Sequence, residues 1–407
     1  MYYLFSDQDI FSGSLKENNA LNIAELGQVF TPQTIVADML ALRKNFGTVL
    51  EPSCGDGAFL RNIDNITGIE IDKKFNQNNV LNIDFFDYSP DNKFDTIIGN
   101  PPYVRYQDIL ISTKNKLNPY SQLFDKRTNL YLFFIYKSIL HLNNGGELIF
   151  ITPRDFLKST SAIKLNEFIY QQGTITDFID LGDAKIFQNA QPNCAIWRFE
   201  KSNFKRNTNV IKEFSCVNGQ LLFTDNQYTV KFNDLFFVKV GAVSGCDEIF
   251  VNEEFGNLDF VYSKTAQTGK TRKMIYNQNI PYLLPFKDKL IKRKIRNFNQ
   301  TNWFCWGRDY YKSDLPRIYV NTKTRNKKPF FTHTCTNYDG SVLAIFPKFN
   351  CNLQTLNKII DELNNVHWQE LGFICDGRFL FSQKSLENCV LPKTFQQFLP
   401  LNQFQVI

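Results

Sequence analysis

Histidine is scarce in this chain of 407 residues, which contains only three copies of it. So few imidazoles weaken any catalytic scheme built on histidine. The nine cysteines are scattered along the chain and include no Cys-x-x-Cys pair. This pattern argues against structural zinc and is typical of a protein from a reducing compartment. We therefore expect no metal site.

Long apolar runs and a targeting segment are also missing. The longest apolar run, from Leu130 to Tyr136, stops at Lys137 and is too short to span a bilayer. No signal peptide is visible, because Asp7 and Asp9 interrupt the N-terminus and no small-residue cleavage site follows. These absences predict a cytoplasmic protein that does not bind a membrane.

Charge is divided unevenly along the chain. Residues 1–200 carry 18 Lys and Arg against 23 Asp and Glu, a net charge of −5, whereas residues 201–407 carry 28 against 17, a net charge of +11; the two values sum to the overall +6. The length and the hydrophobic content of 43% suit two or three globular domains. The division of charge predicts one domain for small-molecule chemistry and one that binds a polyanion.

The central stretch of the sequence runs from Ile98 to Tyr103 and reads Ile-Gly-Asn-Pro-Pro-Tyr. The apolar run before it, residues 94–98, is typical of a buried parallel strand that Gly99 ends. The two prolines fix φ and remove two N–H donors, so nearby carbonyls face outward, and Asn100 adds a side-chain carbonyl. Two oxygen acceptors beside an aromatic ring suit a planar base with an exocyclic NH2 group. By itself, the motif also fits an ordinary turn after a strand.

This motif resembles the Asn-Pro-Pro-Tyr motif of adenine-N6 DNA methyltransferases and some relatives. The resemblance implies that Asn100 Oδ1 and the Pro101 carbonyl accept the two N6 hydrogens of an adenine. It implies that Tyr103 stacks on that base after the base has left the duplex. In the TaqI-type enzymes a second aromatic ring stacks on the opposite face of the base, and Phe187 fits that role by position.

Two stretches before the motif resemble cofactor motifs of the same family. Residues 48–51 read as a strand, and the glycine-containing turn at 52–60 is expected to open a helix and to let a ligand approach the backbone. Residues 66–72 predict a second strand with Glu70 at its end, where an acidic side chain can accept from ribose hydroxyls. Beyond it, Asp84 can accept from an adenine amine while Phe85 packs on the ring.

The order of the motifs resembles that of γ-type methyltransferases, which begin with a cofactor-contact motif such as residues 27–32. Thr31 is predicted to cap the helix that follows this motif. Phe134 is the best match for an aromatic residue against the cofactor adenine. The resemblance implies S-adenosylmethionine as the cofactor, with these residues at its site: Thr31, Glu51, Ser53, Gly55, Glu70, Ile71, Asp84, Phe85, Asn100, Pro102 and Phe134.

The fold class predicted for the first half is α/β, a Rossmann-like methyltransferase sheet of about seven strands that closes near residue 200. Further strands are expected at 146–151, 175–181 and 194–200, with helices at 129–142 and 162–170. The polar stretch 105–126 lacks a clear period and is predicted to be a substrate-side loop that orders on DNA, with plain disorder as the alternative. The predicted domains are an arm (1–26), a catalytic domain (27–201) and an α+β target-recognition domain (210–407).

Three segments of the second half resemble the specificity domain of TaqI-type enzymes, at 236–245, 280–284 and 317–320. Two basic runs, at 287–296 and 323–328, have Tyr, Trp and Asn nearby and suit phosphate contact with base reading. A single basic run is usually a solvated face, but two runs on the basic half favour DNA. The predicted DNA contacts are Lys287, Lys289, Lys292, Arg293, Lys323, Arg325 and Lys327.

The resemblance as a whole implies a monomeric, bacterial, site-specific methyltransferase that modifies N6 of a flipped adenine in duplex DNA within a restriction–modification system. The expected partner besides DNA is a separately encoded restriction endonuclease, since the length leaves no room for a fused nuclease. The Asn-Pro-Pro-Tyr motif also occurs in methyltransferases of protein glutamine and of guanine N2 in ribosomal RNA, which local chemistry does not separate. A non-catalytic DNA-binding subunit with the same fold is a further alternative.

Overall fold

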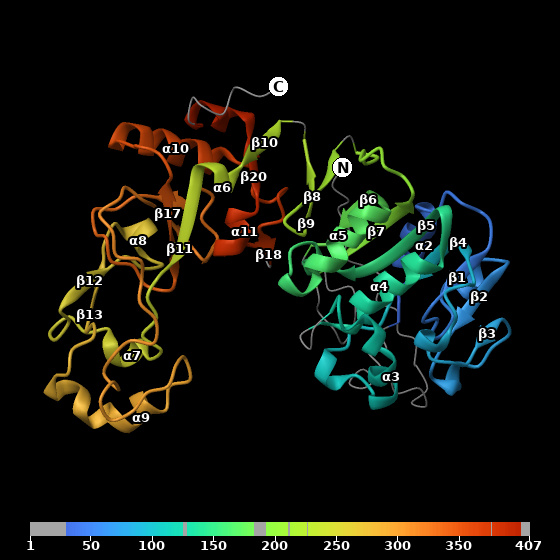
Figure 1. The fold of residues 1–407 in the computed structure, drawn as a ribbon, viewed down its shortest axis with the longest axis horizontal. Helices are drawn as coiled ribbons and strands as arrows, with labels where there is room; N and C mark the ends of the chain where they lie inside the picture. The colour runs from blue at the N-terminus through green and yellow to red at the C-terminus, as the bar shows by residue number, and fades with distance from the viewer. Residues whose placement is uncertain are drawn as a thin grey trace, which may run out of the picture.

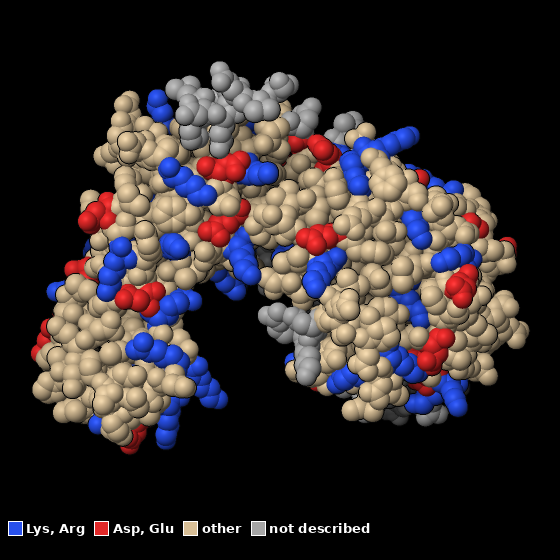
Figure 2. Space-filling view, viewed as in Figure 1, with Lys and Arg blue, Asp and Glu red and all other residues tan. Residues whose placement is uncertain are grey.

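The computed structural model describes residues 30–399, apart from 125–127, 183–192, 211, 226 and 376. It has two lobes that join at one end and leave an open gap between their other ends (Figures 1 and 2). The N-terminal lobe holds a large sheet with helices on both faces, and the C-terminal lobe holds several small sheets. The predicted N-terminal arm, residues 1–26, lies outside the described residues.

A seven-stranded sheet forms the N-terminal lobe, with the strand order β3-β2-β1-β4-β5-β7-β6. Neighbouring strands are parallel except at β7, which runs antiparallel to both β5 and β6. The winding direction reverses between β1 and β4, and such a switch point leaves a crevice at the carboxyl ends of the strands. The strands are β1 (Val49–Glu51), β2 (Ile66–Ile69), β3 (Val80–Leu81), β4 (Phe94–Gly99), β5 (Leu142–Pro153), β6 (Gly173–Asp180) and β7 (Cys194–Lys201).

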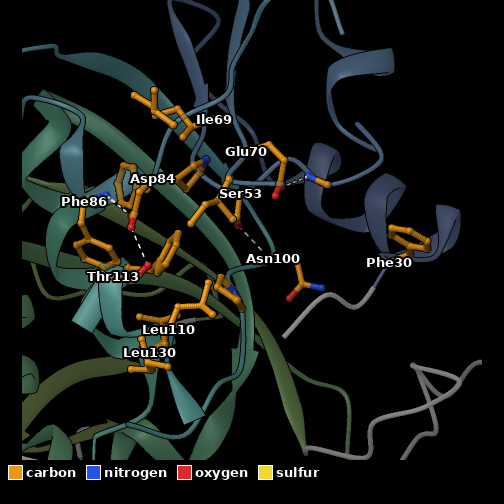
Figure 3. A pocket seen from close by; sticks show the side chains of 18 residues that line it. Phe30, Ser53, Ile69, Glu70, Asp84, Phe86, Asn100, Leu110, Thr113 and Leu130 are labelled. Atoms are coloured by element: carbon orange, nitrogen blue, oxygen red, sulfur yellow. Dashed lines mark hydrogen bonds between the residues drawn. The ribbon is translucent and has the colours of Figure 1, made fainter. Parts of the chain in front are cut away.

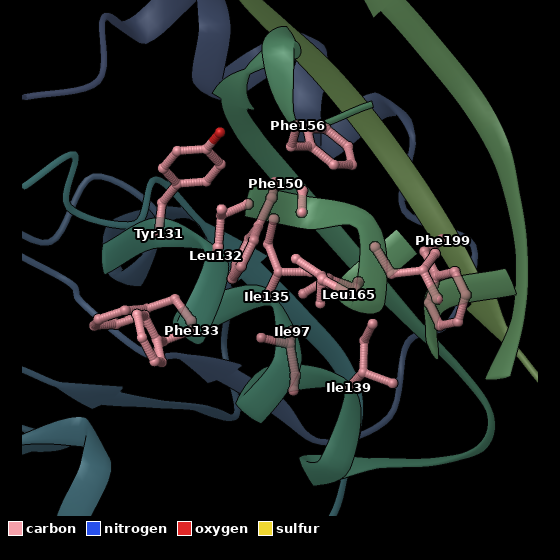
Figure 4. Close-up of a cluster of buried hydrophobic side chains, with 14 of the residues drawn as sticks. Ile97, Tyr131, Leu132, Phe133, Ile135, Ile139, Phe150, Phe156, Leu165 and Phe199 are labelled. Carbon is pink, nitrogen blue, oxygen red and sulfur yellow. The ribbon is translucent and has the colours of Figure 1, made fainter. Parts of the chain in front are cut away.

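Both faces of this sheet are buried, as the continuous apolar runs predict. Along β5, Leu148 and Phe150 pack into the core that also contains residues of α4 and α5. Figure 4 shows Phe150 among these side chains. The alternate residues Ile149 and Ile151 pack into a second core with α2, because successive strand residues point to opposite faces. The helices that cover the sheet are α2 (Gln33–Ala41), α4 (Leu130–His141) and α5 (Ile163–Gln172).

Two local expectations for this lobe are wrong. Only one short 3-10 turn, Leu60–Asn62, follows the glycine-containing turn after β1, because Gly55 and Gly57 adopt positive φ values of 50° and 79° that a right-handed helix does not allow. The stretch 105–126 is not a loop in its described part. It contains α3 (Ile111–Lys116) between the 3-10 turns Tyr106–Asp108 and Asn118–Tyr120.

The C-terminal lobe is built around a four-stranded antiparallel sheet with the order β11-β17-β14-β16. One face of this sheet packs on α10 and α11, and a smaller aromatic core covers the other face. Its tip, farthest from the N-terminal lobe, carries α7, α9 and the β12–β13 pair around a separate core (Figure 1). The antiparallel sheets and short helices agree with the expected α+β class.

The elements of this lobe are short. Its strands are β10 (Tyr228–Lys231), β11 (Phe236–Val240), β12 (Leu258–Phe260), β13 (Arg272–Met274), β14 (Ile318–Asn321), β15 (Lys323–Thr324), β16 (Phe330–Phe331), β17 (Val342–Pro347), β18 (Ile374–Cys375), β19 (Arg378–Leu380) and β20 (Val390–Pro392). Its helices are α6 (Phe232–Leu235), α7 (Asp247–Phe250), α8 (Thr265–Thr268), α9 (Lys287–Ile291), α10 (Leu353–Asn365) and α11 (Gln383–Glu387).

The two lobes join through the hairpin β8 (Glu213–Val217) and β9 (Gln220–Thr224). Phe214 and Leu221 of this hairpin belong to the core of the N-terminal lobe, whereas Leu222 belongs to that of the C-terminal lobe. The hairpin that follows the boundary predicted at residue 210 therefore contributes side chains to both cores, and the predicted domain boundaries stay a prediction. Within the described part of the chain, no helix is both long and apolar enough to cross a membrane.

Candidate active site

A cavity of about 780 Å³ opens at the carboxyl ends of β1, β2 and β4, beside the switch point of the sheet (Figure 3). The residues predicted at the cofactor site that do line it are Ser53, Gly55, Glu70, Ile71, Asp84, Phe85, Asn100, Pro102 and Phe134. The sheet thus brings together side chains that are up to 81 positions apart in the sequence.

The buried carboxylate of Glu70 connects the loop after β1 with the end of β2. Its oxygens accept from the backbone N–H of Gly55 at 2.8 Å and from that of Asp72 at 2.9 Å. Burial raises the pKa of Glu70, although these two N–H groups favour the charged form. The result is a fixed carboxylate on the cavity wall, where it can accept further hydrogen bonds from hydroxyl groups.

Glu51 is buried at the end of β1, directly before Pro52 and Ser53 of the cavity lining, and its predicted contact with the cofactor stays a prediction. Its Oε2 atom has no hydrogen-bond partner among the described residues. Burial raises the pKa of Glu51 well above its usual range, and the charges of Asp56 and Glu70 raise it further. Two buried carboxyl groups of this kind would be stabilised in their charged forms by a positively charged ligand.

Asp84 ties the cavity to α3. Its Oδ1 atom accepts from the backbone N–H of Phe86 at 2.9 Å, while Oδ2 accepts from the Thr113 hydroxyl at 2.7 Å and from Lys116 Nζ at 3.3 Å. Figure 3 shows Thr113 beside Asp84 in the cavity wall. The segment that was expected to be a substrate-side loop therefore forms part of the cofactor cavity.

Two aromatic rings form the apolar end of the cavity. Phe85 and Phe134 stack with ring centroids 5.1 Å apart and an interplanar angle of 29°. The buried Lys137 donates from Nζ to the Phe85 carbonyl at 2.6 Å, and burial lowers the pKa of this lysine to about 8. These contacts hold the Phe85 backbone in place, so the rings offer a fixed apolar surface to a planar group.

Asn100, directly after β4, is held at three atoms. Its Nδ2 atom donates to Thr31 Oγ1 at 3.2 Å, and its backbone carbonyl accepts from Ser53 Oγ at 3.3 Å. The Tyr103 hydroxyl is 2.6 Å from Asn100 Oδ1 and 2.9 Å from the Ile151 carbonyl, and can donate to either. A carbonyl oxygen has two lone pairs and can accept more than one hydrogen bond.

Tyr103 points its hydroxyl into the protein rather than toward solvent. Burial raises the pKa of Tyr103 well above its usual range, so the side chain is a neutral phenol. Its ring meets that of Tyr131 edge to face, with centroids 5.9 Å apart. The predicted stacking of Tyr103 on a base stays a prediction, and Phe187, predicted on the opposite face, lies outside the described residues.

Thr31 does not cap a helix, contrary to the prediction. Pro32 occupies the cap position of α2, and no side chain caps that end. Thr31 does not line the cavity either, and its hydroxyl accepts from the Asn100 amide instead.

The sequence analysis did not predict the other residues that line the cavity, most of which are apolar: Phe30, Pro52, Ile69, Ile83, Phe86, Ile109, Leu110, Thr113 and Leu130. The spacing Ile109–Thr113–Leu117, with all three buried, was the helical signal for some of them.

Arg293 is not available to a polyanion, contrary to the prediction. Its side chain is buried and donates to backbone carbonyls, including Leu290 O at 2.8 Å, Trp303 O at 2.5 Å and Cys305 O at 2.9 Å. These bonds close the loop after α9, so Arg293 has a structural role.

The other predicted DNA contacts differ in exposure. Lys287 is half-buried beside the Trp303 ring, and Lys289 is exposed but pairs with Glu248. The remaining four are exposed: Lys292, Lys323, Arg325 and Lys327. In Figure 2, Lys and Arg side chains gather on the edge of the tip that faces the gap between the lobes.

The strand order, the switch point and the acidic and aromatic cavity beside it define the fold of the S-adenosylmethionine-dependent methyltransferases. The solved structure of the Type IIL restriction-modification enzyme MmeI in complex with DNA shares this fold, with a TM-score of 0.53, 12% sequence identity and coverage of 88% of this chain and 64% of that chain. Residues 43–187 match the Eco57I restriction-modification methylase family.

Curated relatives with similar sequences carry restriction–modification names. The Type II methyltransferase M.HincII of Haemophilus influenzae is 34% identical over 197 residues, 46% of this chain and 39% of its own length. M.TthHB8I of Thermus thermophilus is 31% identical over 201 residues, 43% and 45% of the two chains. The restriction enzyme and methyltransferase RM.Eco57I of Escherichia coli is 28% identical over 317 residues, 75% and 30% of the two chains. The matches thus span less than half of each relative.

Proposed function

We propose that this chain is a site-specific DNA methyltransferase of a restriction–modification system, and that it transfers a methyl group from S-adenosylmethionine to N6 of an adenine. One observation carries the proposal: Asn100 and Pro102 of the Asn-Pro-Pro-Tyr motif line the same cavity as Glu70 and Asp84. In this proposal the methyl acceptor would lie beside the cavity that holds the methyl donor. The names of the relatives and the matched family support restriction–modification methylation.

The cavity suits S-adenosylmethionine, the cofactor implied by the fold and the matched family. When bound, this cofactor supplies an electrophilic methyl group on a sulfonium. Glu70 would accept from its ribose hydroxyls, and Asp84 would accept from its adenine amine beside the rings of Phe85 and Phe134. The orphaned carboxyl oxygen of the buried Glu51 adds negative potential next to a positively charged ligand.

In this proposal the chain's residues act on the attacking nitrogen. Asn100 Oδ1 and the Pro101 carbonyl would accept the two amine hydrogens and draw the nitrogen lone pair out of conjugation with the ring. Tyr103 would stack on the base, which must leave the duplex at a cost of roughly a few kcal/mol. Stacking returns about 1–3 kcal/mol per aromatic contact. Positioning and electrostatics then supply most of the acceleration, without a general base.

The γ-type, TaqI-like assignment and the target-recognition role of the C-terminal lobe are also part of the proposal. They are supported by the order of the motifs and by the basic side chains beside the gap, which is open to a bulky polyanion (Figure 2). A separately encoded restriction endonuclease is the proposed partner.

The test measures transfer of a tritiated methyl group from S-adenosylmethionine to DNA, RNA and protein substrates. We expect transfer to duplex DNA alone, with the label recovered as N6-methyladenine. Asn100→Ala should abolish transfer and retain DNA binding, because it removes one of the two acceptors. Asn65→Ala is the matched control, since Asn65 is exposed at the opposite edge of the sheet. Full turnover by Asn100→Ala, or transfer to RNA or protein instead of DNA, would contradict the proposal.

A further inference from the structure

The chain that leaves α9 at the tip of the C-terminal lobe is strongly basic. Residues 289–308 contain six Lys and Arg and no Asp or Glu. Within this stretch the side chains of Lys292, Lys294 and Arg296 are exposed, whereas Arg293 between them is buried. The segment after α9 runs along the side of the tip that faces the gap between the lobes (Figure 1). Exposed cations without acidic neighbours in the sequence suit contact with a polyanion.

The buried guanidinium of Arg293 ties this loop to the rest of the tip. Nε donates to the Leu290 carbonyl of α9 at 2.8 Å, and Nη1 donates to the Ser244 carbonyl. Nη2 donates to the Trp303 carbonyl at 2.5 Å and to the Cys305 carbonyl at 2.9 Å. A guanidinium is a planar fork with five N–H donors, so four bonds to three separate segments fix the backbone at this position.

Two further contacts fix the residues that follow Arg293. The Phe298 ring lies over the guanidinium, with its centroid 3.8 Å from Arg293 Cζ. Ile295 lies directly against Gly307, since a Cβ atom added to this glycine would be only 2.7 Å from Ile295 Cγ2. The chain's own contacts therefore define the shape of the loop that carries the exposed cations.

We propose that Arg293 is a positioning residue for DNA binding, which holds the loop 292–296 in shape so that Lys292, Lys294 and Arg296 contact phosphates of duplex DNA. This inference rests on the proposed function and adds that Arg293 acts through its neighbours without touching the DNA. A loop that is ordered before binding loses less conformational entropy when the complex forms, so the affinity is higher. Burial lowers the pKa of Arg293 to about 10, so the side chain stays charged and keeps all its donors at neutral pH.

The experiment measures the Kd of a fluorescently labelled duplex of mixed sequence by anisotropy at a fixed salt concentration. Arg293→Met should raise this Kd by about tenfold, because the loop must then be ordered on binding. Arg293→Lys should not restore it, since an ammonium group cannot replace the fork. Gly307→Ala changes no charge but displaces Ile295, and should also weaken binding. The Kd of S-adenosylmethionine should stay within about twofold of wild type in all three variants.

Arg317→Met is the matched control. Arg317 is also buried in the C-terminal lobe and donates to backbone carbonyls, among them Leu315 O at 3.2 Å and Thr336 O at 3.0 Å. It lies outside the loop 292–296, so its replacement should leave the Kd of the duplex unchanged.

A double-mutant cycle shows whether Arg293 acts through the exposed cations. In a background with Gln at positions 292, 294 and 296, Arg293→Met should raise the Kd by about twofold or less, because the side chains that it positions are gone. The same tenfold effect in both backgrounds would overturn the inference. So would wild-type affinity in Arg293→Lys, which would assign the effect to charge alone, or wild-type affinity in both Arg293→Met and Gly307→Ala.

Methyl NMR tests the shape of the loop in the free chain. The order parameter of the Ile295 Cδ1 methyl group should be high in wild type and lower in Arg293→Met, and equal values would refute the positioning role. Failure of the proposed function looks different, because the wild-type chain would then neither bind duplex DNA nor transfer a methyl group to it. Methyl transfer to DNA by wild type, with unchanged DNA binding by Arg293→Met, would overturn this inference alone.

Discussion

Individual buried side chains in the catalytic lobe have polar partners that are distant in sequence. Asn100 and Glu70 are examples at the cavity. His141, at the end of α4, is an example away from the cavity. Its side chain is fully buried, its Nδ1 atom bonds to the Asn92 carbonyl at 2.8 Å, and its ring stacks on Tyr88 with centroids 5.4 Å apart. Burial lowers the pKa of His141 to about 4.

The buried His141 should make part of the free energy of unfolding sensitive to acid. The unfolded chain binds a proton at this side chain below about pH 6.5, whereas the folded chain does so only near pH 4. The unfolded state therefore binds more protons in this window, so the contribution of His141 is complete above about pH 6.5 and falls by up to roughly 3 kcal/mol as the pH drops toward 4. Denaturant unfolding at several pH values should show a shallower decline for His141→Phe than for wild type. Identical slopes would refute this assignment.

At the scale of elements, α3 shows how a short helix can complete a site that the large sheet begins. Thr113 and Lys116 of α3 both bond to Asp84, and the residues just before Thr113 add apolar surface to the cavity. The helix is only six residues long, so tertiary contacts must stabilise it. The position of α3 depends on Ile109 and Leu117 at its two ends, because both side chains are buried in the core of the N-terminal lobe.

Removing the hydroxyl that joins α3 to the cavity should weaken cofactor binding. Thr113→Val leaves Asp84 without one of its donors, so we expect the Kd of S-adenosylmethionine to rise by about fivefold, equivalent to one lost hydrogen bond of about 1 kcal/mol. Calorimetric titration measures this Kd directly. Thr113→Ser retains the hydroxyl and should bind nearly as wild type. If both variants bind equally well, the hydrogen bond to Asp84 does not support the cavity.

At the scale of the whole molecule, the two lobes form an arch that is closed only at one end (Figure 2). Lys158 of the N-terminal lobe lies at this closed end, with Nζ 4.1 Å from the centroid of the Phe373 ring of the other lobe. Burial lowers the pKa of Lys158 to about 8, and the cation–π contact compensates part of the cost of burying the charge. The two lobes are therefore in contact at this end, and the basic tip lies across the open gap from the N-terminal lobe (Figure 2).

The position of the basic tip predicts a salt-dependent contribution to DNA binding. Lys292 and Lys294 are exposed in the loop after α9, and replacing both by Gln should reduce the slope of log K against log salt by up to about 2, since each phosphate contact contributes roughly 0.9. Fluorescence anisotropy with a labelled duplex at several salt concentrations measures the slope. Lys358 and Lys393 are exposed elsewhere on the C-terminal lobe, and their double Gln variant is the charge-matched control. Equal losses in the two pairs would show that net charge, and not the tip, is responsible.

The sequence by itself determined the catalytic sheet, the class of the fold and most of the cofactor cavity. Continuous apolar runs such as residues 148–151 predict buried parallel strands, because both faces of such strands are covered. Glycines and acidic residues directly after those strands must meet at one edge, because parallel strands end on the same side of a sheet. Local pattern and the family resemblance together predicted that Gly55, Glu70, Asp84 and Asn100 lie close to one another, and all four line one cavity.

Only the tertiary structure decided which partner each polar group finds. From the sequence alone, Thr31 was expected to cap a helix and Arg293 to contact DNA. In the fold, Thr31 bonds to the Asn100 amide, and Arg293 is buried against backbone carbonyls. The physical reason is that burial removes water as a partner. A polar group must then pair with whatever the fold brings within hydrogen-bond distance, however far away it lies in the chain.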